Sequence, residues 1–149
     1  MKWITREHPK IDRIACPWLI LNFIDREAEF IYAPKEEVLS LAKSLDAIPY
    51  DLAGAEYTHE GEYCTFDYIL KKHDIRDTYL LQIAEIVRGA DTNRFELAPQ
   101  AAGLWAISAG LSYNYPDDQD MLAIGMRIYD ALYSWAKYAQ AERHTWNPA

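Results

Sequence analysis

The sequence has 149 residues, of which 50% are hydrophobic and 26% are charged. This composition excludes a disordered chain, and the length fits a single domain over residues 1–149. Acidic residues outnumber Lys and Arg by 23 to 15, which gives a formal net charge of -8. Neither nucleic acid nor a membrane surface is therefore an expected partner, because both are anionic.

The sequence carries no sign of secretion or of a membrane span. Its N-terminus reaches Arg6 and Pro9 before any apolar stretch of signal-peptide length. No apolar run approaches the roughly 20 residues that a membrane span needs. Two cysteines, Cys16 and Cys64, without a CxxC motif, do not indicate a disulfide framework. We expect a cytoplasmic protein with reduced thiols.

The first part of the chain mixes strand-like and helical patterns. Apolar residues recur at helical spacing over 11–22, although Pro17 is expected to kink or restart that helix. A second amphipathic helix is expected over 35–45, opened by Pro34. Three short apolar segments bounded by Pro or Gly are candidate strands: 2–5, 29–32 and 47–50. Strands separated by helices predict a small, partly parallel sheet.

From Thr65 onward the pattern is helical almost throughout. The expected helices are 66–72 after an N-cap at Thr65, 78–88 between Asp77 and Gly89, one from Pro99 to near Gly110, and a longest one capped by Asp117 or Asp118. The predicted fold class is α+β and α-rich, with a small N-terminal β-sheet of short strands with helices, followed by a C-terminal helical bundle.

A first group of polar residues precedes and enters the first helix: Arg6, His8, Asp12, Arg13 and Cys16. The guanidinium groups of Arg6 and Arg13 offer planar sets of donors that suit an oxyanion. At helical spacing Asp12 and Cys16 share one face. The alternative is ordinary capping, ion pairing and a small core thiol.

A second group gathers ligand types for borderline and hard metals between His59 and Asp67, including Cys64. We retain His59 and Asp67 as candidate metal ligands. The alternative is a polar loop in which Thr65 and Asp67 begin a helix.

A third group, Arg88 to Glu96, follows a strongly apolar helix. A carboxylate at a helix C-terminus is disfavoured by the dipole, so Asp91 needs another reason, such as a metal, an arginine or a cap. We take Asp91 as a third candidate ligand and Arg88 as a third candidate anion-binding residue. The cofactor expected is a divalent or iron-type metal ion. No nucleotide cofactor is expected, since no phosphate-binding motif occurs.

Short segments spread along the chain resemble one known family, the C-terminal domain of ChrB-type chromate-resistance proteins. The matching segments are Trp3–Arg6, Ile11–Ile20, Phe23–Asp25, Pro49–Asp51, His59, Cys64–Asp67, Ile86–Asp91, Ala101–Gly103 and Tyr129–Tyr133. The resemblance implies a role in bacterial chromate resistance, in which longer members regulate a chromate efflux operon. It implies no particular catalytic residue. Since the sequence begins at this domain, we expect no DNA-binding region.

Three hypotheses remain open. In the first, the domain binds or senses a small oxyanion, chromate or sulfate-like, through Arg6, Arg13 and Arg88. In the second, His59, Asp67 and Asp91 hold a metal in a redox or hydrolytic enzyme, with Cys64 or Asp12 nearby. In the third, the aromatic C-terminal helix is an interaction module, with a homodimer as one form. The first two can coexist, because a bound metal is itself an anion site.

Overall fold

The N-terminal part of the chain forms a three-stranded parallel sheet. In the computed structural model, which describes residues 1–148, β1 (Lys2–Arg6) is the central strand between β2 (Glu29–Ala33) and β3 (Ala47–Pro49). Trp3 of β1 pairs with Phe30 on one side and Ile48 on the other. The three predicted strands are confirmed. Every pairing is parallel, which goes further than the partly parallel sheet expected.

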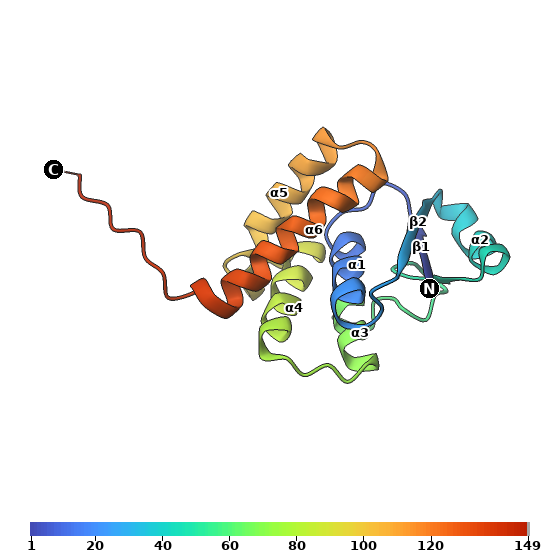
Figure 1. Ribbon diagram of the computed structural model, residues 1–149, viewed down its shortest axis with the longest axis horizontal. Helices are drawn as coiled ribbons and strands as arrows, with labels where there is room; N and C mark the ends of the chain where they lie inside the picture. The colour runs from blue at the N-terminus through green and yellow to red at the C-terminus, as the bar shows by residue number, and fades with distance from the viewer. Residues whose placement is uncertain (149) are drawn as a thin grey trace.

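Helices cover both faces of this sheet. Helix α1 (Asp12–Phe23) connects β1 to β2, and η1 (Lys35–Glu37) with α2 (Val38–Leu45) connects β2 to β3. Figure 1 shows α1 and α2 on opposite sides of the strands. Successive side chains of β1 point to opposite faces of the sheet. Trp3 packs in the main core, and Ile4 packs in a smaller core with α2. The strand order therefore reverses at β1, and the carboxyl ends of β1 and β3 lie side by side.

Helix α1 continues through Pro17 without being restarted there. Proline has no N–H, so the carbonyl of Arg13, four residues earlier, lacks its helical donor. The hydroxyls of Tyr32 and Tyr50 donate to that carbonyl at 3.4 and 3.3 Å. Tyr32 of β2 and Tyr50, directly after β3, thus replace the helical hydrogen bond that the proline removes.

The rest of the chain is helical. Helices α3 (Thr65–Lys72), α4 (Thr78–Asp91), α5 (Ala101–Asn114) and α6 (Asp118–Ser134) gather on the α1 side of the sheet, with η2 (Phe95–Leu97) before α5 and a π-helical turn, η3 (Trp135–Ala139), at the end (Figure 1). This arrangement confirms the predicted fold class. Among the described residues, no helix combines the length and apolarity needed to cross a membrane.

The helix boundaries follow the predicted caps in two cases and depart from them in two others. Asp77 accepts from the backbone N–H of Tyr79 and Leu80, and Asp117 accepts from Asp120. Before α3, however, the N-cap is Cys64 rather than Thr65, and α5 continues beyond Gly110.

Gly89 does not end its helix. Helix α4 continues to Asp91, so the predicted stop at Gly89 is wrong. A Cβ atom at this position would lie 2.9 Å from the Cβ of Ala101 and from the carbonyl oxygen of Arg94. Glycine is needed here for the close approach of α4 to α5 and to the loop after it.

Candidate metal centre

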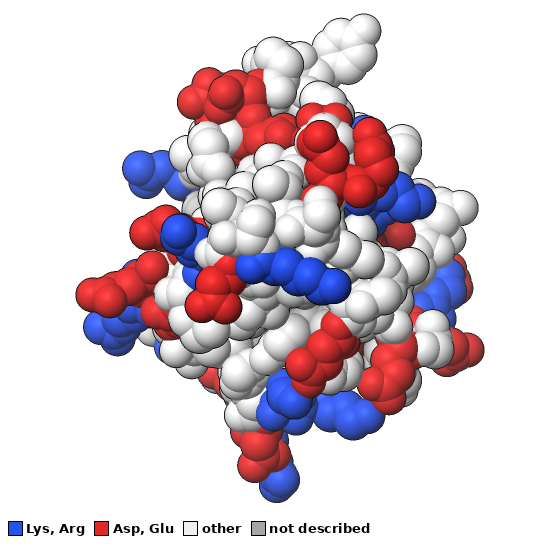
Figure 2. All heavy atoms as spheres, turned by 90° about the vertical axis from the view of Figure 1, so that its right-hand side faces the viewer, with Lys and Arg blue, Asp and Glu red and all other residues white. Residues whose placement is uncertain are grey.

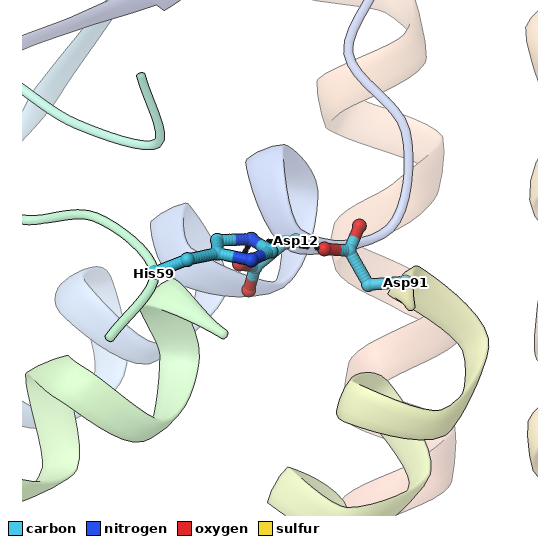
Figure 3. Close-up of side chains that lie close together, drawn as sticks. All are labelled: Asp12, His59 and Asp91. Atoms are coloured by element: carbon cyan, nitrogen blue, oxygen red, sulfur yellow. Dashed lines mark ion pairs between the residues drawn. The ribbon is translucent and has the colours of Figure 1, made fainter. Parts of the chain in front are cut away.

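Three side chains from separate parts of the chain converge between α1 and α4. Asp12 is the first residue of α1, Asp91 is the last residue of α4, and His59 comes from the loop between β3 and α3 (Figure 3). One ligand atom from each lies within 4.8 Å of the others. The Nε2 atom of His59 lies 3.4 Å from Asp12 Oδ2 and 3.1 Å from Asp91 Oδ2.

A fourth residue, Asp51, meets the same imidazole. Its Oδ1 lies 3.2 Å from His59 Nε2 and accepts a hydrogen bond from the Thr65 hydroxyl at 2.8 Å. Its Oδ2 faces two guanidinium groups, with Arg6 Nη2 at 3.4 Å and Arg13 Nε at 3.6 Å. Asp51 was not among the candidate ligands. Its position just after β3 could have indicated it, because ligands bind outside the carboxyl ends of parallel strands where the strand order reverses.

The Asp12 carboxylate is held in place by the start of α3. The backbone N–H of Thr65 donates to Oδ2 at 2.7 Å, and that of Phe66 donates to Oδ1 at 3.1 Å. The thiol of Cys16, one turn further along α1, also donates to Oδ1 at 3.3 Å. The Asp12 carboxylate thus accepts from N–H groups that a helix N-terminus leaves free, and it joins α1 to α3.

The backbone that presents Asp12 is itself unusual. Ile11 has a φ of 45°, in the left-handed region that β-branched residues rarely adopt. Its carbonyl accepts from the buried hydroxyl of Tyr129 at 3.1 Å, a contact that links α6 to the start of α1. Strain of this kind persists only where the surrounding structure fixes it, and it gathers at functional sites.

The cluster is buried on one side and open on the other. The side chain of Asp12 is 0% exposed, that of Asp91 is 19% exposed and that of His59 is 40% exposed. Burial raises the pKa of Asp12 to about 7, against the lowering effect of its contact with His59. Hydrogen bonds to Asp12, Asp51 and Asp91 raise the pKa of His59 to about 12. In Asp51, the contacts with His59 and Thr65 outweigh burial and lower the pKa.

These shifts predict how the metal-free chain responds to pH. Protonated His59 contributes stability that is complete below the ordinary pKa of 6.5 and is lost as the pH rises towards 12. Asp12 acts in the same direction, because ionising it in the buried site costs stability as the pH rises from 3.8 through about 7. We therefore expect the Tm, measured with a chelator present, to fall between about pH 6 and about pH 9.

The His59→Gln variant is the control for this pH effect. Glutamine does not titrate, so only the Asp12 contribution should remain and the fall in Tm should become shallower. A Tm that rises over the same interval would contradict the expected direction.

The other predicted site residues lie in neighbouring networks. Asp67 is not part of the three-ligand group: its Oδ1 lies 3.0 Å from Nη1 of Arg88, and its Oδ2 accepts from the N–H and the thiol of Cys64 at 3.0 and 3.2 Å. Arg88 also stacks over the Tyr63 ring at 4.9 Å. This ion pair joins α3 to α4.

The first polar group divides between the cluster and the surface. The Nη1 atom of Arg13 donates to the carbonyls of Arg6 and Glu7 at 2.9 and 3.0 Å. His8 is exposed, and its backbone N–H donates to Asp118. The structure therefore brings Arg6, Arg13 and Asp12 to the cluster but leaves His8 outside it.

The donor set suits a divalent cation. Carboxylate oxygens are the ligands of Mg²⁺ and Mn²⁺, and an imidazole nitrogen adds affinity for Fe²⁺ or Zn²⁺. Asp12, His59 and Asp91 come from a helix start, a loop and a helix end. A cation would therefore hold together segments that are distant in the sequence.

The fold and this cluster define an α-rich α+β domain with acidic and histidine side chains at the carboxyl edge of a small parallel sheet. The family model described as "ChrB, C-terminal domain" matches residues 3–136, so the chain belongs to that family. The predicted resemblance is thereby confirmed. No solved structure matches the chain.

A similar curated protein is Protein ChrB of Cupriavidus metallidurans, which is 32% identical over 134 residues. The matched region is 89% of this chain and 40% of that protein. The chain thus corresponds to less than half of its longer relative.

Proposed function

We propose that this domain serves in chromate resistance by holding a divalent cation between Asp12, His59 and Asp91, and that a small oxyanion binds at that cation. The observation that carries the proposal is the convergence of the three ligand atoms within 4.8 Å of one another. Membership of the ChrB family supports the biological setting.

The charge of the cluster favours a cation. Three carboxylates surround one imidazole, and of these carboxylates only Asp51 forms ion pairs with the nearby guanidinium groups of Arg6 and Arg13. Asp12 and Asp91 therefore share a single positive partner in His59. Buried charges are normally paired or coordinate a metal, so a divalent ion between them would supply the missing charge.

Two of the three candidate arginines are poorly placed to hold an oxyanion alone. Arg13 is occupied by Asp51 and by backbone carbonyls, and Arg88 is occupied by Asp67. An anion would instead meet the cation from the side where His59 reaches the surface. The proposal thus combines the first two hypotheses: the oxyanion binds at the metal ion and not at the arginine group.

A binding role is favoured over nucleophilic catalysis. Both thiols near the cluster, Cys16 and Cys64, are buried, and burial raises the pKa of each. A thiol is a nucleophile only as thiolate, so neither is activated. Two free cysteines also fit a reducing compartment, and we place this function in the cytoplasm.

The test is a two-stage titration of the chelator-treated, dialysed chain. Calorimetry with Mn²⁺ and with Zn²⁺ should show one ion bound per chain. Chromate or sulfate should then bind to the metal-loaded chain and not to the metal-free chain. A chain that binds neither ion stoichiometrically overturns the cation site, and equal oxyanion binding with and without metal overturns the route through the metal.

A further inference from the structure

Helix α5 carries no charged side chain along its 14 residues, yet much of it faces solvent. It buries only Ala101, Leu104 and Ser108, on the side that meets α4 and α6. Trp105 is 49% exposed and Tyr113 is 92% exposed. A helix at the surface of a soluble domain normally turns charged residues outward, so the outer face of α5 has the composition of a packed face.

The outer face of α5 has a small-residue centre with larger side chains at its edges. At 100° per residue, Ala106, Gly103 and Gly110 lie near the middle of the exposed arc, between Trp105 on one edge and Ile107 on the other. Tyr113 lies at nearly the same angle as Ala106 but about two turns further along, at the C-terminal end of this face. A Cβ atom at either glycine would meet nothing within 4 Å. The Trp105 ring rests beside Phe95, with the ring centroids 6.1 Å apart, so one edge is already supported.

We propose that this face packs against the same face of a second copy of the chain, forming a two-fold symmetric dimer. The flat centre lets two helices approach closely, and the large edge residues of one copy fit beside the small residues of the other. The proposal is independent of the cation site, since α5 contributes none of the residues of the cluster.

The uncharged α5 face favours an uncharged occupant, which the same face of a second copy supplies. The chain has a formal net charge of -8, so two copies repel each other over most approaches. The end of the molecule at α2 carries acidic and basic side chains scattered over its surface (Figure 2). Two α5 faces bring no ionised groups of their own together, whereas a charged partner would lose hydration against this apolar face without gaining an ion pair.

The exposed area indicates a reversible association. Trp105 and Tyr113 together expose roughly 300 Å² on each copy, given the 150–250 Å² that an aromatic side chain can bury. The two copies contribute about 600 Å² from these rings, to which Ile107 and the small residues add. The rings alone supply about half of the roughly 1,200 Å² at the lower limit for stable interfaces, so the dimer should dissociate on dilution.

The test is sedimentation velocity of the chelator-treated chain from low micromolar to near-millimolar concentration. The parent chain should pass from monomer to dimer as concentration rises. Ala106→Glu should raise the dimer Kd by about tenfold or more, because two like charges would meet across the axis. Ser40→Glu, on the exposed surface of α2, is the matched control and should leave the Kd unchanged.

A second variant separates the dimer from folding. Gly110→Gln replaces an exposed helical glycine with a better helix former, so the Tm should stay level or rise. The same side chain fills the flat centre and should weaken the dimer. A chain that stays monomeric at every concentration, or a dimer unaffected by both α5 variants, overturns the proposal.

Discussion

Replacing Asp12 with alanine is expected to lower the free energy of unfolding of the metal-free chain by about 3 kcal/mol. The substitution removes the acceptor for the N–H groups of Thr65 and Phe66, both of which are buried. Leaving a buried donor unsatisfied costs roughly 1–3 kcal/mol, and two donors are left here. In a chain of this size the Tm should fall by about 6–12 °C.

An opposing effect limits the loss. Asp12 is desolvated and lies near the charges of Asp51 and Asp91, which together raise its pKa, so its removal also relieves a cost. We expect the capping contacts to dominate because helix α3 has only eight residues and begins on this carboxylate. If burial cost dominated instead, the variant would be as stable as the parent chain or more so.

Urea unfolding followed by circular dichroism measures this difference. Asp12→Asn keeps one oxygen acceptor and should lose about half as much stability. Glu85→Ala, at an exposed position within α4, is the matched acidic control and should stay within about 0.5 kcal/mol of the parent. An unchanged midpoint for Asp12→Ala would show that α3 does not depend on this contact.

The parts of the fold predicted from sequence are those set by local chemistry. The strands 2–5, 29–32 and 47–50 were recognisable because they are short apolar runs with clear ends, and Asp77 and Asp117 marked helix starts through their capping side chains. The helix end predicted at Gly89 is wrong because the role of this glycine is not local. Its small size serves a contact with Ala101 on another helix, which no local pattern reveals.

In the candidate site too, residues with a local role could be predicted from sequence, and contacts formed by tertiary structure could not. Asp91 could be singled out from sequence because a carboxylate is unfavourable at a helix C-terminus. The cap contact between Asp67 and Cys64 is local, because the two residues are three positions apart, and it occupies one oxygen of Asp67. Asp12, in contrast, meets residues 53 and 54 positions away, so its place beside His59 depends on tertiary structure.

The His59→Ala variant is expected to lose more than about 100-fold in affinity for Mn²⁺ or Zn²⁺. Mutating a residue that only hydrogen-bonds to a metal ligand typically lowers metal affinity by about 10–100-fold, and loss of a ligand itself should cost more. His59 supplies the only nitrogen ligand of the three-ligand group. Its Nε2 atom also contacts the carboxylates of Asp12, Asp51 and Asp91. Asp91→Asn should produce a comparable loss while keeping the size of the side chain.

His73→Ala is the matched control for this affinity measurement. His73 stacks on Tyr57, with 6.2 Å between ring centroids, and lies outside the three-ligand group, so its loss should leave cation affinity within about threefold. Calorimetric titration of the three variants, each checked for folding by circular dichroism, separates the alternatives. Equal affinity in His59→Ala and His73→Ala would mean that any bound cation lies elsewhere. A selective loss in His59→Ala and Asp91→Asn would locate it between α1, α4 and the loop that carries His59.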